Sequence, residues 1–211
     1  MSYVFFDLDN TLIRGQSQQL LLKVLYKRKI ISFIDLWKLR IFFLLYTLHL
    51  VSHKNTVDVY IKVARMLQGV EVAYLKKVVR AFVFAEFGSI QNLRAVGELE
   101  KHVSAGKHVV LVSAAFEPIV EAAAQFFQIP QYECTKLEIK GHIYTGKLFG
   151  QPNYGEQKIK NLEKYGFEGS FAYSDHHSDI PLFLKATYRY AVNPTRKLKK
   201  YATSRGWFVI E

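Results

Sequence analysis

The chain has 211 residues, half of them hydrophobic, and 29 Lys or Arg against 18 Asp or Glu residues give it a net charge of +11. This length suits one catalytic core with a smaller added domain, and the absence of internal repeats and low-complexity tracts excludes repeat and disordered proteins. The single cysteine, Cys134, excludes an intrachain disulfide. Because Met1 leads directly into the first predicted strand, we expect no cleavable signal peptide and a cytoplasmic location, or a peripheral one at the inner membrane surface.

Two acidic residues follow the first predicted strand. The apolar residues 3–6 lead into Asp7 and Asp9, and side chains two positions apart in an extended segment point the same way. Such a pair without a basic neighbour is costly unless a cation lies between the two carboxylates, and a hard divalent ion suits them. The alternative is a turn, because Asp and Asn are frequent in turns and Thr11 can cap a following helix.

The region from residue 18 to residue 87 has apolar residues at helical spacing, which predicts a small helical bundle. Its most apolar stretch, residues 41–51, is too short to span a bilayer, and a buried helix is the simpler interpretation. The alternative is contact with an anionic membrane. Residues 16–88 contain twelve Lys or Arg against four acidic residues, a net charge of +8, and each basic residue near such a surface is worth about 1 kcal/mol.

A second polar position follows the apolar run 109–112, where Ser113 ends a predicted buried strand and precedes a helix predicted from residue 117 to residue 128. The simple interpretation of Ser113 is a helix cap. The functional alternative is an anion site made by its hydroxyl and the free N–H groups of Ala114 and Ala115.

Lys158 is a third candidate, at the start of another predicted helix. A cation there is unfavourable to the helix dipole, and an anionic ligand would explain it. The alternative is a solvated lysine on a basic protein.

A fourth group follows the short predicted strand 170–174, which delivers Asp175 and Asp179 to its carboxyl end. One of them could cap a helix. Together with Asp7 and Asp9 they form a cluster of four acidic side chains, which implies a metal ion.

In this order and at these spacings, the four parts resemble the signature motifs of the haloacid dehalogenase superfamily of phosphotransferases. The likeness spans nearly the whole chain. It implies an α/β fold with a Rossmann-like core, a parallel sheet, and a helical cap of the first type inserted after the first strand. We therefore expect residues 1–15 and 89–211 to form the core and residues 16–88 to form the cap.

The resemblance also implies roles for the motif residues. Asp7 would attack the phosphorus and become an aspartyl phosphate, while Asp9 would act as acid and then base. Magnesium would be held by an Asp7 oxygen, the main-chain carbonyl of Asp9 and the Asp175 carboxylate. Asp179 would position Lys158 or a metal-bound water. The groups expected to bind the phosphoryl oxygens are Thr11, Ser113, Ala114 and Lys158.

Within the superfamily, the predicted hairpin at residues 137–148 and the fourth motif resemble the subfamily of phosphoserine phosphatases. The chain is closer to poorly defined bacterial members, which include phosphatidylglycerophosphate phosphatases. Asn10 and His176 replace glycines of many relatives. Gln16 stands where phosphoserine phosphatases carry a glutamate for the substrate amine, which weakens phosphoserine as the substrate.

The C-terminal part is predicted to contain a strand at residues 188–192, a basic helix from Thr195 to Gly206, and an apolar end at residues 207–210 that closes the core.

These features together predict a magnesium-dependent phosphomonoesterase that acts on a small or lipid phosphomonoester. The alternatives are a phosphotransferase to an acceptor other than water, and a non-catalytic phosphate-binding or membrane-binding module. No sequence motif supports specific nucleic-acid binding.

Overall fold

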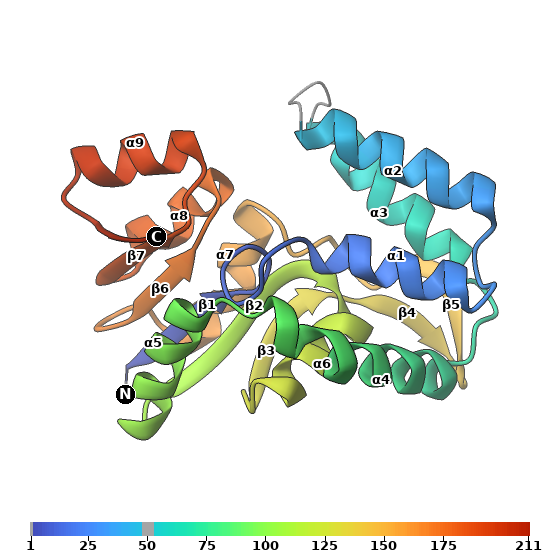
Figure 1. The fold of residues 1–211 in the computed structure, drawn as a ribbon, viewed down its shortest axis with the longest axis horizontal. Helices are drawn as coiled ribbons and strands as arrows, with labels where there is room; N and C mark the ends of the chain where they lie inside the picture. The colour runs from blue at the N-terminus through green and yellow to red at the C-terminus, as the bar shows by residue number, and fades with distance from the viewer. Residues whose placement is uncertain (1, 48–52) are drawn as a thin grey trace.

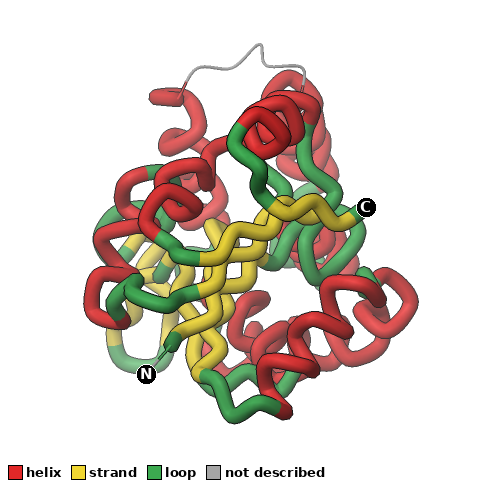
Figure 2. Tube along the Cα trace, turned by 90° about the vertical axis from the view of Figure 1, so that its left-hand side faces the viewer, coloured by secondary structure: helices red, strands yellow, loops and turns green. Residues whose placement is uncertain are grey.

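The computed structural model describes residues 2–47 and 53–211. Their central sheet has six parallel strands in the order β3-β2-β1-β6-β7-β8 (Figures 1 and 2). The strands are β1 Tyr3–Asp7, β2 His108–Phe116, β3 Gln131–Thr135, β6 Phe171–Ser174, β7 Tyr188–Val192 and β8 Phe208–Ile210. This arrangement confirms the predicted α/β class with a parallel sheet.

Successive residues of the central strands supply two separate apolar layers. Val4 and Phe6 of β1 belong to the core cluster on one face of the sheet, whereas Phe5 belongs to the cluster on the other face. In β2, Leu111 belongs to the same cluster as Val4 and Phe6, and Val110 belongs to the same cluster as Phe5. Because side chains alternate along a strand, a continuous apolar run is what a sheet covered on both faces requires.

Helices cover both faces. The first face is covered by α4 Val72–Ile90, α5 Leu93–Ser104 and α6 Glu117–Phe126, and the second by α7 Glu156–Leu162, α8 Ile180–Lys185 and α9 Arg196–Ser204. Two short 3-10 helices, η1 Glu163–Tyr165 and η2 His177–Asp179, precede β6 and α8. Parallel strands joined through helices bring several strand carboxyl ends to one edge of the sheet, where ligands bind in such folds.

Between β1 and β2 the chain forms α1 Ser17–Lys27, α2 Phe33–Thr47 and α3 His53–Met66, followed by α4. Figure 1 shows α2 and α3 standing away from the sheet, and α4 running along α6. A salt bridge of 2.7 Å joins Lys76 of α4 to Glu121 of α6. Most of α4 belongs to the predicted cap, residues 16–88, but the helix packs along α6 of the core.

An antiparallel hairpin, β4 Leu137–Lys140 and β5 Ile143–Leu148, reaches from the core to the end of α3. The Tyr144 N–H donates to the Val70 carbonyl at 3.0 Å, and the Gly69 N–H donates to the Tyr144 carbonyl at 2.9 Å. A Cβ atom added at Gly146 would lie 2.9 Å from Cβ of Gln68, so only glycine allows this close approach. The hairpin predicted at residues 137–148 is present, and it hydrogen-bonds to the residues that follow α3.

The apolar stretch at residues 41–51 falls partly on α2, and residues 48–52 lie outside the described residues. None of the helices in the described ranges is long and apolar enough to cross a membrane.

Candidate active site

Two strands deliver acidic residues to the same edge of the sheet, and a third strand beside β1 delivers Ser113. Asp7 ends β1, where it pairs in register with Val112 of β2, one residue before Ser113. On the other side of β1, Phe6 pairs with Tyr173 of β6, so Asp175 follows the neighbouring strand directly. The edge predicted from the sequence therefore gathers the first, second and fourth motifs.

Lys158 completes this edge from α7. Its side chain is 5% exposed, and its Nζ lies 2.9 Å from Oδ1 of Asp7 and 2.8 Å from Oδ2 of Asp179. The alternative of a solvated lysine is therefore wrong. Burial lowers the pKa of Lys158, but the charges of Asp179 and Asp7 outweigh burial, and the pKa ends above its ordinary value.

Asp179 fixes the lysine from the fourth motif. Its Oδ2 accepts a hydrogen bond from the Ser174 hydroxyl at 2.6 Å as well as from Lys158. Both acceptor contacts are buried, so the carboxylate has little freedom to turn. The contact expected between Asp179 and Lys158 is present, and Ser174 is a supporting residue that the sequence did not single out.

Asp9 is held by the start of the helical insertion. Its Oδ1 accepts a hydrogen bond of 2.7 Å from the N–H of Ser17, the first residue of α1. Between them, Asn10 adopts a left-handed backbone with φ 53°, and its Oδ1 accepts from the Gly15 N–H at 3.1 Å. Asn tolerates this conformation, so its presence in place of glycine costs little.

The carboxyl groups of this edge are poorly solvated and close to one another. Burial, with the charges of Asp179 and Asp9 adding to it, raises the pKa of Asp7 to about 7 even though Lys158 opposes the shift. Burial and then the charge of Asp7 raise the pKa of Asp175 to about 8. Burial also raises the pKa of Asp9. The edge thus holds more negative charge than its buried lysine compensates.

This donor set suits a hard divalent cation. Asp7, Asp9, Asp175 and Asp179 offer oxygen atoms alone, and Mg²⁺ is bound by carboxylates and carbonyls. The cluster of four acidic side chains predicted from the sequence is wrong, because within residues 2–47 and 53–211 no three His, Cys, Asp or Glu side chains lie together as a metal site. Asp179 is instead engaged by Lys158 and Ser174, and Asp9 by the Ser17 N–H. The set expected from the sequence includes only two side-chain carboxylates, those of Asp7 and Asp175, and the main-chain carbonyl of Asp9, so it does not need a third side chain.

Ser113 differs from its prediction in one respect. Strand β2 continues to Phe116, and α6 begins only at Glu117, so Ser113 does not cap the helix. The Ala115 N–H is not free, because it donates to Oγ of Ser113 at 3.1 Å. The pairing of β2 with β3 shifts register between Val112 and Phe116, so this hydrogen bond lies within an irregular part of the strand.

Thr11 carries an unused hydroxyl at the same edge. The residue is fully buried, and its Oγ1 has no hydrogen-bond partner. The backbone is well fixed, since the Thr11 carbonyl accepts from Nδ2 of Asn92 at 3.0 Å. A buried hydroxyl without a partner is costly, and a phosphoryl oxygen could supply one.

Asn153 is a buried supporting residue that the sequence did not predict. Its Nδ2 donates to the carbonyls of Ser113 at 2.9 Å and Glu133 at 3.1 Å, and its Oδ1 accepts from Asn161 at 2.9 Å. Its own N–H donates to Oγ1 of Thr135 at 3.0 Å. Asn153 thus ties the loop before α7 to the backbone of the second motif. Asn153 follows Pro152, a context typical of a turn, and it belongs to none of the four motifs, so the sequence did not indicate its role.

Tyr60 reaches the edge from α3. The Tyr60 and Phe116 rings lie edge to face with centroids 5.6 Å apart. Burial raises the pKa of the Tyr60 phenol, and the charge of Asp9 adds to the shift. The sequence showed Tyr60 only as part of a helical apolar pattern.

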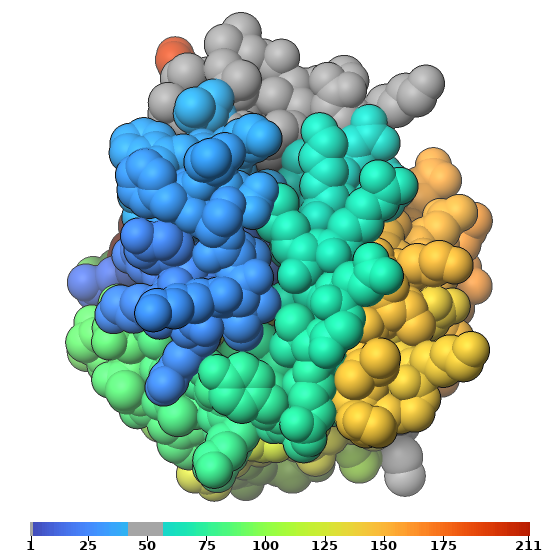
Figure 3. Space-filling model, turned by 90° about the vertical axis from the view of Figure 1, so that its right-hand side faces the viewer, coloured from blue at the N-terminus to red at the C-terminus, as the bar shows by residue number. Residues whose placement is uncertain are grey.

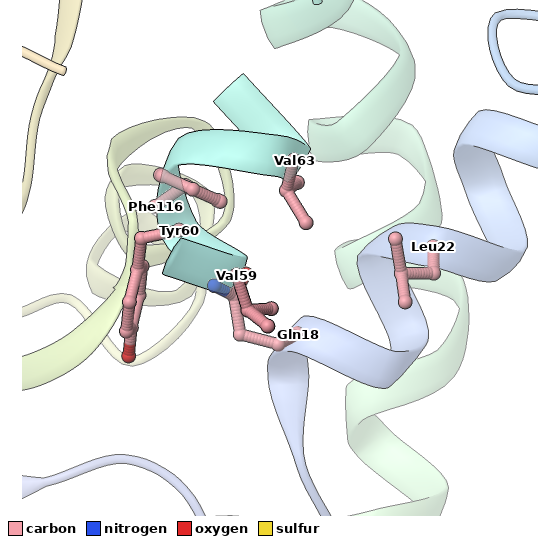
Figure 4. Close-up of a pocket in the computed structure, with 6 residues that line it drawn as sticks. All are labelled: Gln18, Leu22, Val59, Tyr60, Val63 and Phe116. Carbon is pink, nitrogen blue, oxygen red and sulfur yellow. The ribbon is translucent and has the colours of Figure 1, made fainter. Parts of the chain in front are cut away.

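A small apolar pocket lies beside Tyr60, between the helical insertion and the end of β2 (Figure 4). Its cavity volume is about 20 Å³, roughly the space of one water molecule. No charged side chain is among the residues that line it, which are Gln18, Leu22, Val59, Tyr60, Val63 and Phe116. Gln18 comes from α1, next to the Ser17 N–H that holds Asp9.

Two other polar residues raised by the sequence have local partners. Nδ1 of His176 lies 2.8 Å from Oγ of Ser178 and accepts from the Ser178 N–H at 3.2 Å, so His176 caps η2. Oε1 of Gln16 accepts from Nε2 of Gln19 at 3.0 Å, on the exposed start of α1.

Comparison with known proteins gives a consistent family. A family model described as haloacid dehalogenase-like hydrolase matches residues 4–184. A probable phosphatase of Mycobacterium tuberculosis is 28% identical over 98% of this chain and 74% of its own length. A histidinol-phosphatase of Neisseria meningitidis is 24% identical over 97% of this chain and 96% of its own length.

Solved structures share the fold. A Bordetella pertussis protein of unknown function superimposes with a TM-score of 0.84 at 23% identity, covering 100% of this chain and 97% of that one. A phosphoserine phosphatase, solved as an analogue of its phospho-aspartyl intermediate, superimposes with a TM-score of 0.63 at 18% identity, covering 100% and 93%. The predicted resemblance to phosphoserine phosphatase-like proteins is confirmed at the level of family and fold.

Proposed function

Because the chain belongs to the haloacid dehalogenase-like hydrolase family, we propose that this phosphatase is a magnesium-dependent phosphomonoester hydrolase that acts through an aspartyl phosphate on Asp7. The observation that carries the proposal is the buried chain of contacts from Asp7 through Lys158 to Asp179, with Asp9 held separately by α1. One carboxylate is thereby fixed beside a cation, and a second one is oriented independently of it.

In the first half-reaction, an Asp7 oxygen attacks the phosphorus and the bond from phosphorus to the leaving oxygen breaks. Asp9 gives its proton to that oxygen, so the product leaves as a neutral alcohol. The raised pKa of Asp9 supports this role, because burial favours the protonated carboxyl group, which is the form that can donate a proton.

In the second half-reaction, Asp9 takes a proton from a water molecule, whose oxygen attacks the phosphorus. The bond between Asp7 and phosphorus breaks, and inorganic phosphate leaves. The hydrogen bond from the Ser17 N–H supports the return of Asp9 to its ionised form between the two steps, because it stabilises the charged carboxylate.

The phosphoryl oxygens would be held by Lys158, the hydroxyls of Thr11 and Ser113, and the Ala114 N–H. Support comes from the unpartnered Oγ1 of Thr11 and from the buried Nζ of Lys158. Donors fixed before the reaction stabilise charge in the transition state without reorganisation. Asn153 would act by positioning, since it holds the carbonyl of Ser113.

Magnesium would be held by Asp7, Asp175 and the main-chain carbonyl of Asp9. When bound, it would lower the pKa of Asp7 and offset negative charge on the transferring phosphoryl group. The crowding that raises the pKa values of Asp7 and Asp175 supports this site, because a divalent cation would stabilise both carboxylates in their ionised forms.

For the substrate, we propose an anionic phosphomonoester, small or lipid, whose alcohol is uncharged beside the phosphate. The support is the chemistry of the side chains around Tyr60 rather than the volume of the small pocket there: Gln18 and Tyr60 are polar, and no charged side chain lines it. An ammonium group there would be desolvated without a counter-charge. Gln16 stands in place of the glutamate of phosphoserine phosphatases, and its neutral side chain supports the same conclusion.

For other partners, we propose an anionic membrane surface at the cap and no specific nucleic acid. A cytoplasmic location, peripheral at the inner membrane surface, belongs to the same proposal. What supports it is the net charge of +8 in residues 16–88, the greater part of the +11 of the whole chain.

The test is magnesium-dependent phosphate release by wild type, Asp7→Asn and Asp9→Asn on small phosphomonoesters, phosphoserine, and phosphatidylglycerophosphate in mixed micelles. Glu168→Gln, at an exposed position on the core, is the matched control for loss of one carboxylate. We expect release that requires magnesium, is lost in both site variants and is kept in the control. Equal release by Asp7→Asn would contradict the proposed nucleophile.

The same assay separates hydrolysis from transfer. Added acceptor alcohols should leave the yield of free phosphate unchanged for a hydrolase. A yield that falls in proportion to a phosphorylated alcohol product would favour the phosphotransferase instead.

A further inference from the structure

Helix α2 has large apolar side chains on its solvent side. The exposed fractions are 57% for Phe33, 63% for Ile34, 48% for Trp37 and 51% for Ile41. We call these four residues the cap face. Ile34, Trp37 and Ile41 follow one another at spacings of three and four, and Phe33 lies four residues before Trp37, so all four share one side of the helix. The rings of Phe33 and Trp37 lie edge to face at 6.0 Å, so the face is continuous.

The cap face is not the side by which α2 packs onto the protein. Leu36 and Leu39 are 5% and 3% exposed and belong to the main apolar core. Helix α2 thus has one apolar side that is already buried and a second that is open to solvent. Single exposed apolar residues are ordinary, but a continuous exposed group of this size marks an interaction surface.

Cations surround the cap face. Six exposed basic residues lie on α1, on α2 and between these helices: Lys23, Lys27, Arg28, Lys29, Lys38 and Arg40. Asp35 is the only acidic residue among residues 23–41, and it is engaged at the start of the helix, where its Oδ2 accepts from the Ser32 hydroxyl at 2.7 Å. The surface is therefore apolar in its centre and positive around it.

A groove with the same chemistry adjoins this surface. It lies between α1 and α4 and has a cavity volume of about 250 Å³. Lys27 and Arg28 contribute its cations, and its apolar residues are Val24, Val78, Ala81 and Phe82. Tyr26 connects the groove to the cap face, because its ring lies 6.1 Å from that of Phe33. Figure 3 shows α1, α2 and the start of α4 together on this side of the molecule.

We infer that the cap face is the surface by which the protein binds an anionic lipid bilayer, with α2 lying in the plane of the interface. An apolar helix face inserts between the acyl chains, and flanking lysines and arginines meet the negative headgroups. The apolar residues of the groove could take part of one acyl chain while Lys27 and Arg28 meet its headgroup. Charge complementarity favours this occupant over a second copy, because two copies of this +11 chain would bring the same ring of cations together.

This inference rests on the membrane contact proposed above and assigns it to a surface, but it does not depend on the proposed hydrolysis. The cap face lies on α2, whereas Asp7, Lys158 and Asp179 lie at the sheet edge. Membrane contact would raise the local concentration of a phosphorylated lipid, but the same contact would hold for a protein that hydrolyses a soluble ester.

The experiment uses the fluorescence of Trp37. The chain has two tryptophans, so Trp207→Phe leaves Trp37 as the single reporter within the cap face. The full-length variant is mixed with vesicles of phosphatidylcholine, with or without phosphatidylglycerol, at low and high salt. We expect a blue shift and co-sedimentation with the anionic vesicles at low salt, both weakened by salt.

Two variants test whether vesicle binding depends on the cap face and the cations around it. Ile34→Ser should reduce the partition coefficient for anionic vesicles by about tenfold, because it removes an aliphatic side chain that leaves water when the cap face enters the bilayer. Lys27→Gln should reduce it by about fivefold. Leu184→Ser, which changes an apolar residue on α8 with 55% exposure, is the matched control and should bind like wild type.

Three results would overturn the inference. These are no binding to anionic vesicles by the folded protein, equal binding to neutral vesicles, or binding that Ile34→Ser and Leu184→Ser reduce alike. A dimer that forms without lipid and is lost in Ile34→Ser would assign the cap face to a second copy. Phosphate release from a soluble ester, measured on the same samples, reports the proposed function separately.

Discussion

The sheet edge and the cap face differ in which groups they bury: the edge buries charged groups, and the cap face exposes apolar ones. At the edge, Asp7, Lys158 and Asp179 are almost completely buried, and Lys158 donates to both carboxylates. On the cap face, Phe33, Trp37 and their neighbours are half exposed although they are among the most apolar residues of the chain.

Both regions depart from the usual distribution, in which charges are outside and large apolar groups inside. Each departure has a cost in the free protein, and each points to a ligand of matching chemistry: a cation and a phosphate at the edge, a lipid surface at the cap. The edge is built for chemistry on fixed atoms, whereas the cap face is built for a partner without fixed geometry.

The largest effect is expected from Asp7→Asn. An amide cannot act as the nucleophile, so kcat should fall by about a thousandfold or more. The protein should stay folded, because Lys158 keeps its contact with Asp179. Kinetics with a soluble ester and circular dichroism would check both statements. A variant with most of the wild-type activity would remove the catalytic interpretation of the edge.

Lys158→Met should come next. It leaves Asp7 and Asp179 buried without their cation, which costs about 3 kcal/mol or more of unfolding free energy. Urea unfolding without magnesium would measure it. Lys164→Met is the matched control, since the side chain of Lys164 is 61% exposed and its ion pair with Glu133 should contribute less than about 1 kcal/mol. Equal losses in the two variants would mean that the buried contacts are not special.

Asn153→Ala tests whether the edge depends on positioning. It removes the hydrogen bonds of a fully buried amide and should cost about 2 kcal/mol, with kcat lowered more than KM is raised because Ser113 loses its support. Asn161→Ala removes one bond to the same residue and should cost about 1 kcal/mol. Unfolding and steady-state kinetics on both variants provide the comparison. An unchanged kcat in Asn153→Ala would exclude the positioning role.

His102 is a buried polar residue to which the proposed phosphate hydrolysis assigns no role. It is 8% exposed, and its Nε2 lies 2.9 Å from the Tyr173 hydroxyl. Burial, helped by the charge of Lys107, lowers its pKa to about 4, below the ordinary 6.5. The unfolded chain therefore binds the proton more readily.

The stability contribution of His102 is complete above pH 6.5 and is lost as the pH falls toward 4. The slope in this window is at most about 1.4 kcal/mol per pH unit. Unfolding curves of wild type and His102→Gln across the window should differ in slope. Parallel curves would show that His102 keeps an ordinary pKa in the folded protein.

The smallest effects are expected at the cap face. Ile34→Ser and Trp37→Ser should change the unfolding free energy by about 0.5 kcal/mol or less and leave activity on a soluble ester within about twofold, since both side chains are half exposed. Thermal unfolding and phosphate release would check this. A large loss of stability would show that these residues belong to the core of the protein, which would weaken the contrast with the edge.

The sequence allowed the fold and most of the edge to be predicted because both depend on short patterns. A buried strand followed by acids, as at Asp7 and Asp175, fixes the end of the sheet, and the contact of Asp179 with Lys158 was among the stated alternatives. The Ala115 N–H was assigned wrongly, because β2 extends to Phe116 and its irregular register cannot be read from residue types.

Other residues of the site could not have been found in this way. Asn153 and Tyr60 lie far from the motifs in sequence, and only tertiary packing brings them to Ser113 and to the two N-terminal acids. The cap face is a partial case. The sequence showed an apolar and basic region, but which side of α2 is buried by Leu36 and Leu39 depends on how the helix packs.

The most direct test of the central claim is to trap the phosphoenzyme. Wild-type protein is mixed with magnesium and a substrate from which it releases phosphate, quenched within a turnover, and reduced with borohydride, which converts an acyl phosphate to an alcohol. Peptide mass spectrometry then locates the modified residue. The account predicts homoserine at position 7, dependent on substrate and absent from Asp7→Asn. Reduction at another carboxylate, or turnover with no reducible residue, would contradict it.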